Sequence, residues 1–74
     1  MVNADVAEFK AHEGSRITSK RVCELKLSSQ IELGGLVRDG VGLLVNGNTQ
    51  ILPGDNVVVF CQDTNISQIE KIFK

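Results

Sequence analysis

The sequence has few aromatic residues and no excess of positive charge. It contains no Trp, no Tyr and three Phe among 74 residues. Lys and Arg number 8 against 9 Asp and Glu, so the formal net charge is -1. Proteins that clamp nucleic acid need surplus cations to neutralise phosphates, and single-strand binders stack bases on aromatic rings. The composition therefore argues against both kinds of nucleic-acid binding.

Residues that catalyse reactions or bind metals are also scarce. His12 is the single histidine, and the two cysteines, Cys23 and Cys61, lie far apart and form no CxxC motif. A structural zinc site needs about four ligands, and a nucleophile needs a base within hydrogen-bond reach. No pair of carboxylates is spaced for acid–base chemistry either. We therefore expect no enzyme activity, no catalytic residue, no metal and no cofactor.

Cysteine usage and the lack of long apolar runs indicate where in the cell the protein works. One disulfide is conceivable, but we favour two buried thiols in a reducing cytoplasm. No apolar run approaches the ~20 residues of a membrane span. Residues 1–4 lack the charged and apolar blocks of a signal peptide. We therefore expect a cytoplasmic protein that does not insert into a membrane.

Strand and turn signals make up most of the chain. Asp5 to His12 alternates apolar and polar residues, which predicts a half-buried strand. Further strands are predicted over Leu33–Arg38, Val41–Val45, Thr49–Leu52 and Asn56–Cys61. Tight turns between them are indicated by Asp39-Gly40, Asn46-Gly47 and Pro53-Gly54-Asp55.

Two helices complete the expected fold. Apolar spacing predicts a short helix over Lys20–Leu25, capped by Thr18 or Ser19. A second helix is predicted over Ile66–Phe73, capped from within residues 63–65. We expect one domain over residues 1–74, with residues 1–4 disordered or extraneous to the fold. Its class is α+β: a mostly antiparallel β-sheet with hairpins, a short helix after the first strand and a C-terminal helix packed on one face.

The strand over Asn56–Cys61 is apolar on both faces, because Val57 and Val59 point one way while Val58 and Phe60 point the other. Strands that are covered on one side alternate, whereas strands covered on both sides read as continuous apolar runs. Two short helices cover only one face of a sheet of this size. We therefore predict that another chain or a neighbouring domain buries the other face. A barrel-like curl of the sheet is the alternative.

Two further features suggest binding without fixing a ligand. Gly34-Gly35 lacks a phosphate-binding pattern and fits a β-bulge, or a segment that a backbone or ligand approaches closely. A local group of basic residues is either a solvated face or a docking site for an anionic ligand or acidic partner. Its members are Arg16, Lys20, Arg21 and Lys26.

Arg38 ends an apolar strand immediately before a tight turn. Its guanidinium could pair with a nearby acidic side chain or face a bound anion. The acidic candidates are Glu32, Asp39 and Asp55. Aspartates in tight turns commonly accept hydrogen bonds from their own backbone.

Three motifs stand at specific separations: Leu36-Val37-Arg38-Asp39-Gly40, Gly47-Asn48-Thr49, and Leu52-Pro53-Gly54-Asp55-Asn56-Val57-Val58-Val59-Phe60. Together they resemble the C-terminal regulatory module of bacterial potassium-uptake proteins, known as the TrkA-C or RCK C-terminal domain. The short helix near Val22–Leu27 and the closing helix over Ile66–Phe73 also fall where that family has helices. The resemblance extends from about Ala4 to Lys74.

The resemblance implies a non-catalytic regulatory domain on the cytoplasmic side of the inner membrane, which senses a ligand, forms a homodimer and acts on a potassium transporter or channel. Family members usually follow a nucleotide-binding half with a GxGxxG loop. This chain has no such half, so it looks like part of a longer polypeptide and is not expected to bind NAD or ATP. Two alternatives remain: a swapped-hairpin DNA-binding regulator, which the near-neutral charge disfavours, and a small-anion-binding module.

Some members of that family bind cyclic di-AMP between two copies, through an Asp-x-Arg pair after the short helix and a later Asn. This sequence has Lys26-Leu27-Ser28 and Gly34-Gly35 at those places, so the resemblance does not extend to the residues that hold that nucleotide. For a small-molecule effector, the candidate groove is formed by Ile31, Leu33, Gly34, Gly35 and Arg38.

Overall fold

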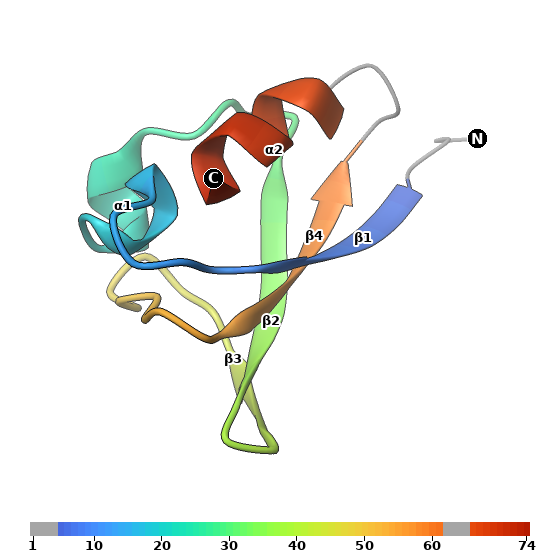
Figure 1. Cartoon of the computed structure of the whole chain (residues 1–74). Helices are drawn as coiled ribbons and strands as arrows, with labels where there is room; N and C mark the ends of the chain where they lie inside the picture. Colours follow the sequence, from blue (N-terminus) through green and yellow to red (C-terminus); the bar gives the residue numbers. More distant parts are fainter. Residues whose placement is uncertain (1–4, 62–65) are drawn as a thin grey trace.

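The computed structural model describes residues 5–61 and 66–74. Seven elements are described along the chain (Figure 1): β1 (Asp5–Lys10), a 3-10 turn η1 (Arg16–Thr18), α1 (Val22–Leu25), β2 (Glu32–Arg38), β3 (Val41–Leu44), β4 (Asn56–Cys61) and α2 (Ile66–Phe73). Within these residues a four-stranded antiparallel sheet with two helices confirms the α+β class. Residues 1–4 and the expected helix caps Asp63, Thr64 and Asn65 lie outside the described residues.

The sheet has the order β1-β4-β2-β3, and each neighbouring pair is antiparallel. β4 pairs with both β1 and β2, which suits its β-branched run Val57–Val59 because such side chains pack well on a pleated surface. β2 and β3 form a hairpin closed by Asp39 and Gly40, at φ 52° and 79°. Positive φ at both positions is what a two-residue hairpin turn of this kind requires.

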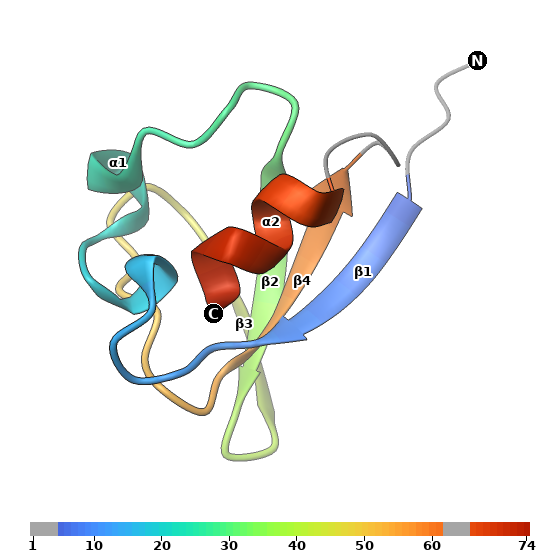
Figure 2. The ribbon, with the colours of Figure 1, turned by 45° about the horizontal axis from the view of Figure 1, so that its top comes forward.

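The core fills the layer between the sheet and α2, which lies across one face (Figure 2). Val57 and Val59 of β4 are fully buried in one cluster with Ile69 and Phe73 of α2. The Phe73 ring also stacks on Phe9 of β1, with centroids 5.1 Å apart. Full burial of side chains of this size stabilises a fold by about 1.5–3 kcal/mol each. This apolar layer therefore holds the C-terminal helix on the predicted face.

The segment Thr49–Leu52 is not the strand that its sequence predicts. It makes one isolated bridge, between Arg21 and Gln50. Side chains take the backbone groups that a strand ladder would use: the Gln50 carbonyl accepts from Arg38 Nη2 at 3.1 Å, and the Leu52 amide donates to Asp55 Oδ2 at 2.8 Å. The sheet consequently has one strand fewer than expected within the described residues.

The first helix begins later than the sequence predicts. The hydroxyls of Thr18 and Ser19, expected as caps, donate instead to carbonyls that precede them in the chain, Thr18 to Ser15 and Ser19 to Arg16. The residue before the helix is Arg21, whose amide donates to the Glu24 carboxylate at 3.2 Å. The Glu24 side chain thus satisfies the Arg21 amide, which would otherwise be left to water at the start of the helix.

Candidate functional site

The face of the sheet opposite α2 carries no helix among the described residues (Figures 1 and 2). We call it the bare face. Apolar side chains stand on it from all four strands: Val6, exposed by 64%, Val37 by 36%, Leu44 by 88% and Phe60 by 39%. Half-buried Val58 lies opposite Gly35 and belongs to the same face. The bare face is therefore an apolar surface open to solvent.

The sheet does not curl to cover this surface. Its strand order is linear, and β1 and β3 are its two edges in the part of the chain that the structure describes. A closed barrel needs every strand to have two neighbours. Charged side chains of Glu8 and Glu32 lie at the margin, opposite Val58 and Phe60 respectively. An apolar centre with a charged margin is the usual anatomy of a protein interface.

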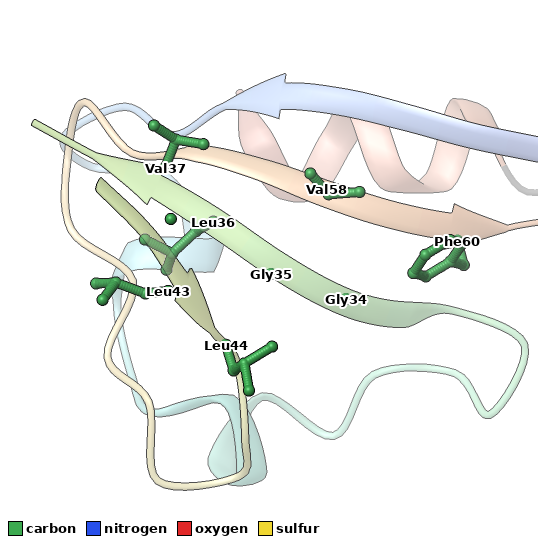
Figure 3. A pocket seen from close by; sticks show the side chains of 9 residues that line it. Gly34, Gly35, Leu36, Val37, Leu43, Leu44, Val58 and Phe60 are labelled. Carbon is green, nitrogen blue, oxygen red and sulfur yellow. The ribbon is translucent and has the colours of Figure 1, made fainter. Parts of the chain in front are cut away.

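The bare face is hollowed over Gly34 and Gly35 (Figure 3). The hollow has a volume of about 370 Å³. Its lining is apolar and comes from β2, β3 and β4: Gly34, Gly35, Leu36, Val37, Gly42, Leu43, Leu44, Val58 and Phe60. A volume of this size lies at the lower end of the ~300–1,000 Å³ range of small-molecule sites.

The two glycines are the reason for the hollow. The β2–β4 register shifts between Leu33 and Gly35, which makes Gly34 the extra residue of a β-bulge. A Cβ at Gly34 would overlap the Phe60 ring, and one at Gly35 would lie 3.1 Å from the Leu43 carbonyl oxygen. Because neither glycine has a side chain, the Phe60 ring packs against the backbone at Gly34 and the hollow stays open. The predicted bulge is confirmed.

The residues predicted to form a groove lie in different places. Gly34 and Gly35 line the hollow on the bare face. Ile31 and Leu33 are half-buried and pack against the core cluster on the helical side. Arg38 is absent from the lining and is engaged elsewhere. Sequence reasoning missed the side chains that neighbouring strands place beside the two glycines, above all Leu44.

Of the acidic partners that the sequence offers to Arg38, the structure selects Asp55. Arg38 donates through Nε to Oδ1 at 2.9 Å and through Nη2 to Oδ2 at 2.7 Å. The carboxylate is 1% exposed and also accepts from the Leu52 amide, as expected of a turn aspartate. The hydrogen bonds from Arg38 hold the pKa of Asp55 below its ordinary value, against the opposing effect of burial. Arg38 therefore fixes the 50–55 segment to β2.

Both cysteines are free. Cys61 is a buried free thiol as expected, but Cys23 is exposed, because Val22 and Leu25 take the inward positions of the short helix. In the part of the chain that the structure describes, no three His, Cys, Asp or Glu side chains gather as metal ligands. No helix there is long and apolar enough to cross a membrane.

Residues 6–74 match the family model of the TrkA-C domain. The Trk system potassium uptake protein TrkA homolog 1 of Methanosarcina mazei is 31% identical over 96% of this chain and 16% of its own length. The Trk system potassium uptake protein TrkA of Haemophilus influenzae is also 31% identical, again over 96% of this chain and 16% of its own length. The chain thus spans about one sixth of the length of these curated relatives.

The fold is shared with solved structures. One described as "Structure of RCK domain with cda" superposes with a TM-score of 0.78, covering 93% of this chain and 97% of that one at 13% identity. At that identity the likeness shows a common fold. The family match covers nearly all of the described residues and rests on the sequence itself. The chain belongs to the TrkA-C domain family.

Proposed function

We propose that the chain is a non-catalytic regulatory domain of a potassium-uptake system. Membership of the TrkA-C family and the names of the relatives, which are Trk potassium uptake proteins, support this role. The family match favours it over the swapped-hairpin DNA-binding alternative. In this proposal the domain works in the cytoplasm, within a longer polypeptide that acts on a transporter at the inner membrane.

The bare face is the surface through which we propose that two copies dimerise. This apolar, uncovered sheet face is the observation that carries the proposal. A two-fold dimer brings the same surface of both copies together. Leu44 is the most exposed of the apolar side chains on that face, and the hollow beside it is apolar. In the proposed dimer, Leu44 of one copy enters the hollow of the other.

The strength of such a dimer can be bounded. Five apolar side chains lie on the bare face: Val6, Val37, Leu44, Val58 and Phe60. Complete burial contributes about 1.5–3 kcal/mol per side chain, so the ten side chains of two copies contribute roughly 15–30 kcal/mol at most. The actual gain is smaller, because Val37, Val58 and Phe60 are already partly buried in one copy. Association costs about 4–15 kcal/mol in lost freedom. The balance is that of a reversible dimer, which a change at Leu44 can shift.

We propose that the effector binds in the same hollow. Of the predicted groove residues, Gly34 and Gly35 belong to this site, and Val58 and Phe60 join them. An effector whose apolar part occupies the hollow would displace Leu44 of the other copy. Ligand binding and dimer geometry are then linked, since a ligand shifts an equilibrium by its difference in affinity for two states. This linkage is the proposed means of regulation.

Potassium uptake in cells tests the regulatory role. The natural polypeptide that contains this domain is expressed with Leu44→Asp or with Leu52→Asp, and the rate of rubidium uptake is measured. Leu52 is 42% exposed and lies outside the hollow, so it is a matched control. We expect Leu44→Asp to alter the uptake rate and Leu52→Asp to leave it unchanged. Equal rates in all three proteins would contradict the proposal.

A further inference from the structure

In the described part of the chain the sheet has two edge strands, β1 and β3, which differ in how they are protected. An edge strand leaves N–H and C=O groups unpaired, and proteins commonly keep other strands away from it with charged side chains. The β1 edge carries three such residues, Asp5, Glu8 and Lys10. The β3 edge, Val41–Leu44, has no charge and no proline, and all four of its residues are exposed. The β3 edge is therefore open to a further strand.

Gly42 and Leu44 direct the free backbone groups of β3 outward. Arg38 and Val41 flank the two-residue turn and form a hydrogen-bonded pair. Such pairs alternate along an antiparallel ladder, so Leu43 also bonds inward to β2. The N–H and C=O groups of Gly42 and Leu44 then face away from β2. Within residues 5–61 and 66–74, no backbone hydrogen bond from a loop reaches them.

These outward groups match the same groups of a second copy. The matching register is an antiparallel ladder between the β3 strands of two copies, centred on Leu43. In it, Gly42 of each copy lies opposite Leu44 of the other, and each such pair exchanges two backbone hydrogen bonds. A two-fold axis through the centre relates the two copies, which is the commonest symmetry of homo-oligomers.

The side chains fit this register on both faces of the sheet. Leu44 is the most exposed apolar side chain of the bare face and stands on β3 beside the hollow (Figure 3). It would lie over Gly42 of the other copy, where a Cβ would meet nothing within 4 Å. Leu43 is on the helical side, because it pairs with buried Leu36. The two Leu43 side chains would therefore meet at the axis.

The lack of charge along this edge favours a second copy as the occupant. In a two-fold contact each residue near the axis meets its own copy, and like charges that lie opposite each other destabilise a ladder. Residues 41–54 contain no charged side chain, although 23% of the residues of the chain are charged. Two identical β3 edges can therefore approach each other without repulsion.

We propose that the β3 edges of two copies pair antiparallel about Leu43 and join their sheets into one. This contact goes beyond the proposed function and does not rest on the dimer proposed there. The edge contact joins two sheets side by side, whereas the proposed dimer joins them face to face. Each copy contributes a strand of four residues to the edge contact.

Amide hydrogen exchange, measured by nuclear magnetic resonance on the 15N-labelled 74-residue chain, tests the pairing. As the chain concentration rises from micromolar to millimolar, the amides of Gly42 and Leu44 should exchange more slowly, because pairing withdraws them from water. The Leu43 amide bonds to β2 in a single copy and should exchange slowly throughout. Gly42→Pro removes one outward N–H at an edge position, where proline is tolerated. It should abolish the concentration dependence at Leu44.

Charged variants test the register. Leu43→Lys places two lysines opposite each other at the axis. Val41→Lys is the matched control, because it adds the same charge to the same strand and face about 14 Å along the ladder from its copy. We expect Leu43→Lys to weaken pairing about tenfold and Val41→Lys to leave it nearly unchanged. An equimolar mixture of Leu43→Lys and Leu43→Glu should restore pairing, because opposite charges then meet.

Three results would overturn the proposal. The first is exchange at Gly42 and Leu44 that does not depend on concentration up to the millimolar range. The second is equal weakening by Leu43→Lys and Val41→Lys, or a mixture that restores nothing. The third is protection of these amides in the natural longer polypeptide but not in the 74-residue chain, which would assign the edge to another segment. None of these variants changes the five apolar side chains counted on the bare face, so the two proposals fail separately.

Discussion

The ion pair between Arg38 and Asp55 gives the sharpest stability prediction. Asp55 is 1% exposed and its carboxylate accepts three hydrogen bonds, two from Arg38 and one from the Leu52 amide. Arg38 also holds the Gln50 carbonyl at 3.1 Å. Asp55→Ala removes every one of the bonds to the carboxylate and leaves the guanidinium without its counter-charge. The 50–55 segment, which Arg38 holds, then loses its attachment to β2.

The size of the effect follows from the burial of the two partners. Removing one member of a buried ion pair costs about 3–5 kcal/mol. The Arg38 side chain keeps 31% of its surface exposed, so water can solvate part of the freed charge, and we expect a loss of about 2–3 kcal/mol. Domains have roughly 0.05–0.15 kcal/mol of stability per residue, which gives this chain about 4–11 kcal/mol. The variant should therefore fold, with a marked loss of stability.

Urea unfolding followed by far-ultraviolet circular dichroism measures this loss, because a chain without Trp or Tyr gives little fluorescence signal. Arg21→Ala is the control, since it removes only the exposed ion pair with Glu24, leaves the residue-21 amide that Glu24 accepts from, and should lose no measurable stability. A double-mutant cycle with Arg38→Met should show strong coupling to Asp55→Ala. A loss below about 0.5 kcal/mol for Asp55→Ala, the range of ordinary surface changes, would refute the reasoning.

Three further predictions follow from the same structure. The pKa of Asp55 is lowered in the folded state, so the Asp55 carboxylate stabilises the fold above its unfolded pKa of about 3.9. That stabilisation is lost as the pH falls through the folded pKa. Urea midpoints measured from pH 6 to pH 2 should therefore fall less steeply in Asp55→Ala than in the wild type. Val59 is 0% exposed, so Val59→Asp should cost several kcal/mol (about 3 or more) and abolish the folded circular-dichroism spectrum, while Val58→Asp on the bare face should keep it. Gly34→Ala forces the Phe60 ring away and should cost about 1–3 kcal/mol; in a Phe60→Ala background the cost should be much smaller, and an unchanged cost would show that the ring is not what the new methyl group meets.

The elements that could be predicted from sequence are those fixed by local chemistry. The β-branched run Val57–Val59 specified the central strand, and Asp39-Gly40 specified the hairpin turn, because few residues tolerate positive φ. The alternation in the first strand and the helical spacing over Ile66–Phe73 were equally direct. In each of these cases the information lies within a few neighbouring residues.

What could not be predicted depends on contacts between distant segments. Thr49–Leu52 has strand-like residues, yet Arg38 and Asp55 satisfy its backbone groups and no ladder forms. Ile31, Leu33 and Gly35 would share one face of a regular strand, but the bulge at Gly34 moves Gly35 to the bare face while Ile31 and Leu33 pack against the core. The hollow on the bare face is assembled from β2, β3 and β4. The spacing of residues in the sequence does not show which distant segments come into contact.

Sedimentation equilibrium of the wild-type chain and of Leu44→Asp tests the central claim, that the bare face joins two copies. The wild type should show a reversible monomer–dimer equilibrium. Two-fold symmetry removes Leu44 from both copies at once, so a loss of about 1.5 kcal/mol for each should weaken the dimer roughly 100-fold, while Leu52→Asp should leave it unchanged. A wild-type chain that stays monomeric up to millimolar concentration, or a dimer that Leu44→Asp does not weaken, would contradict the account.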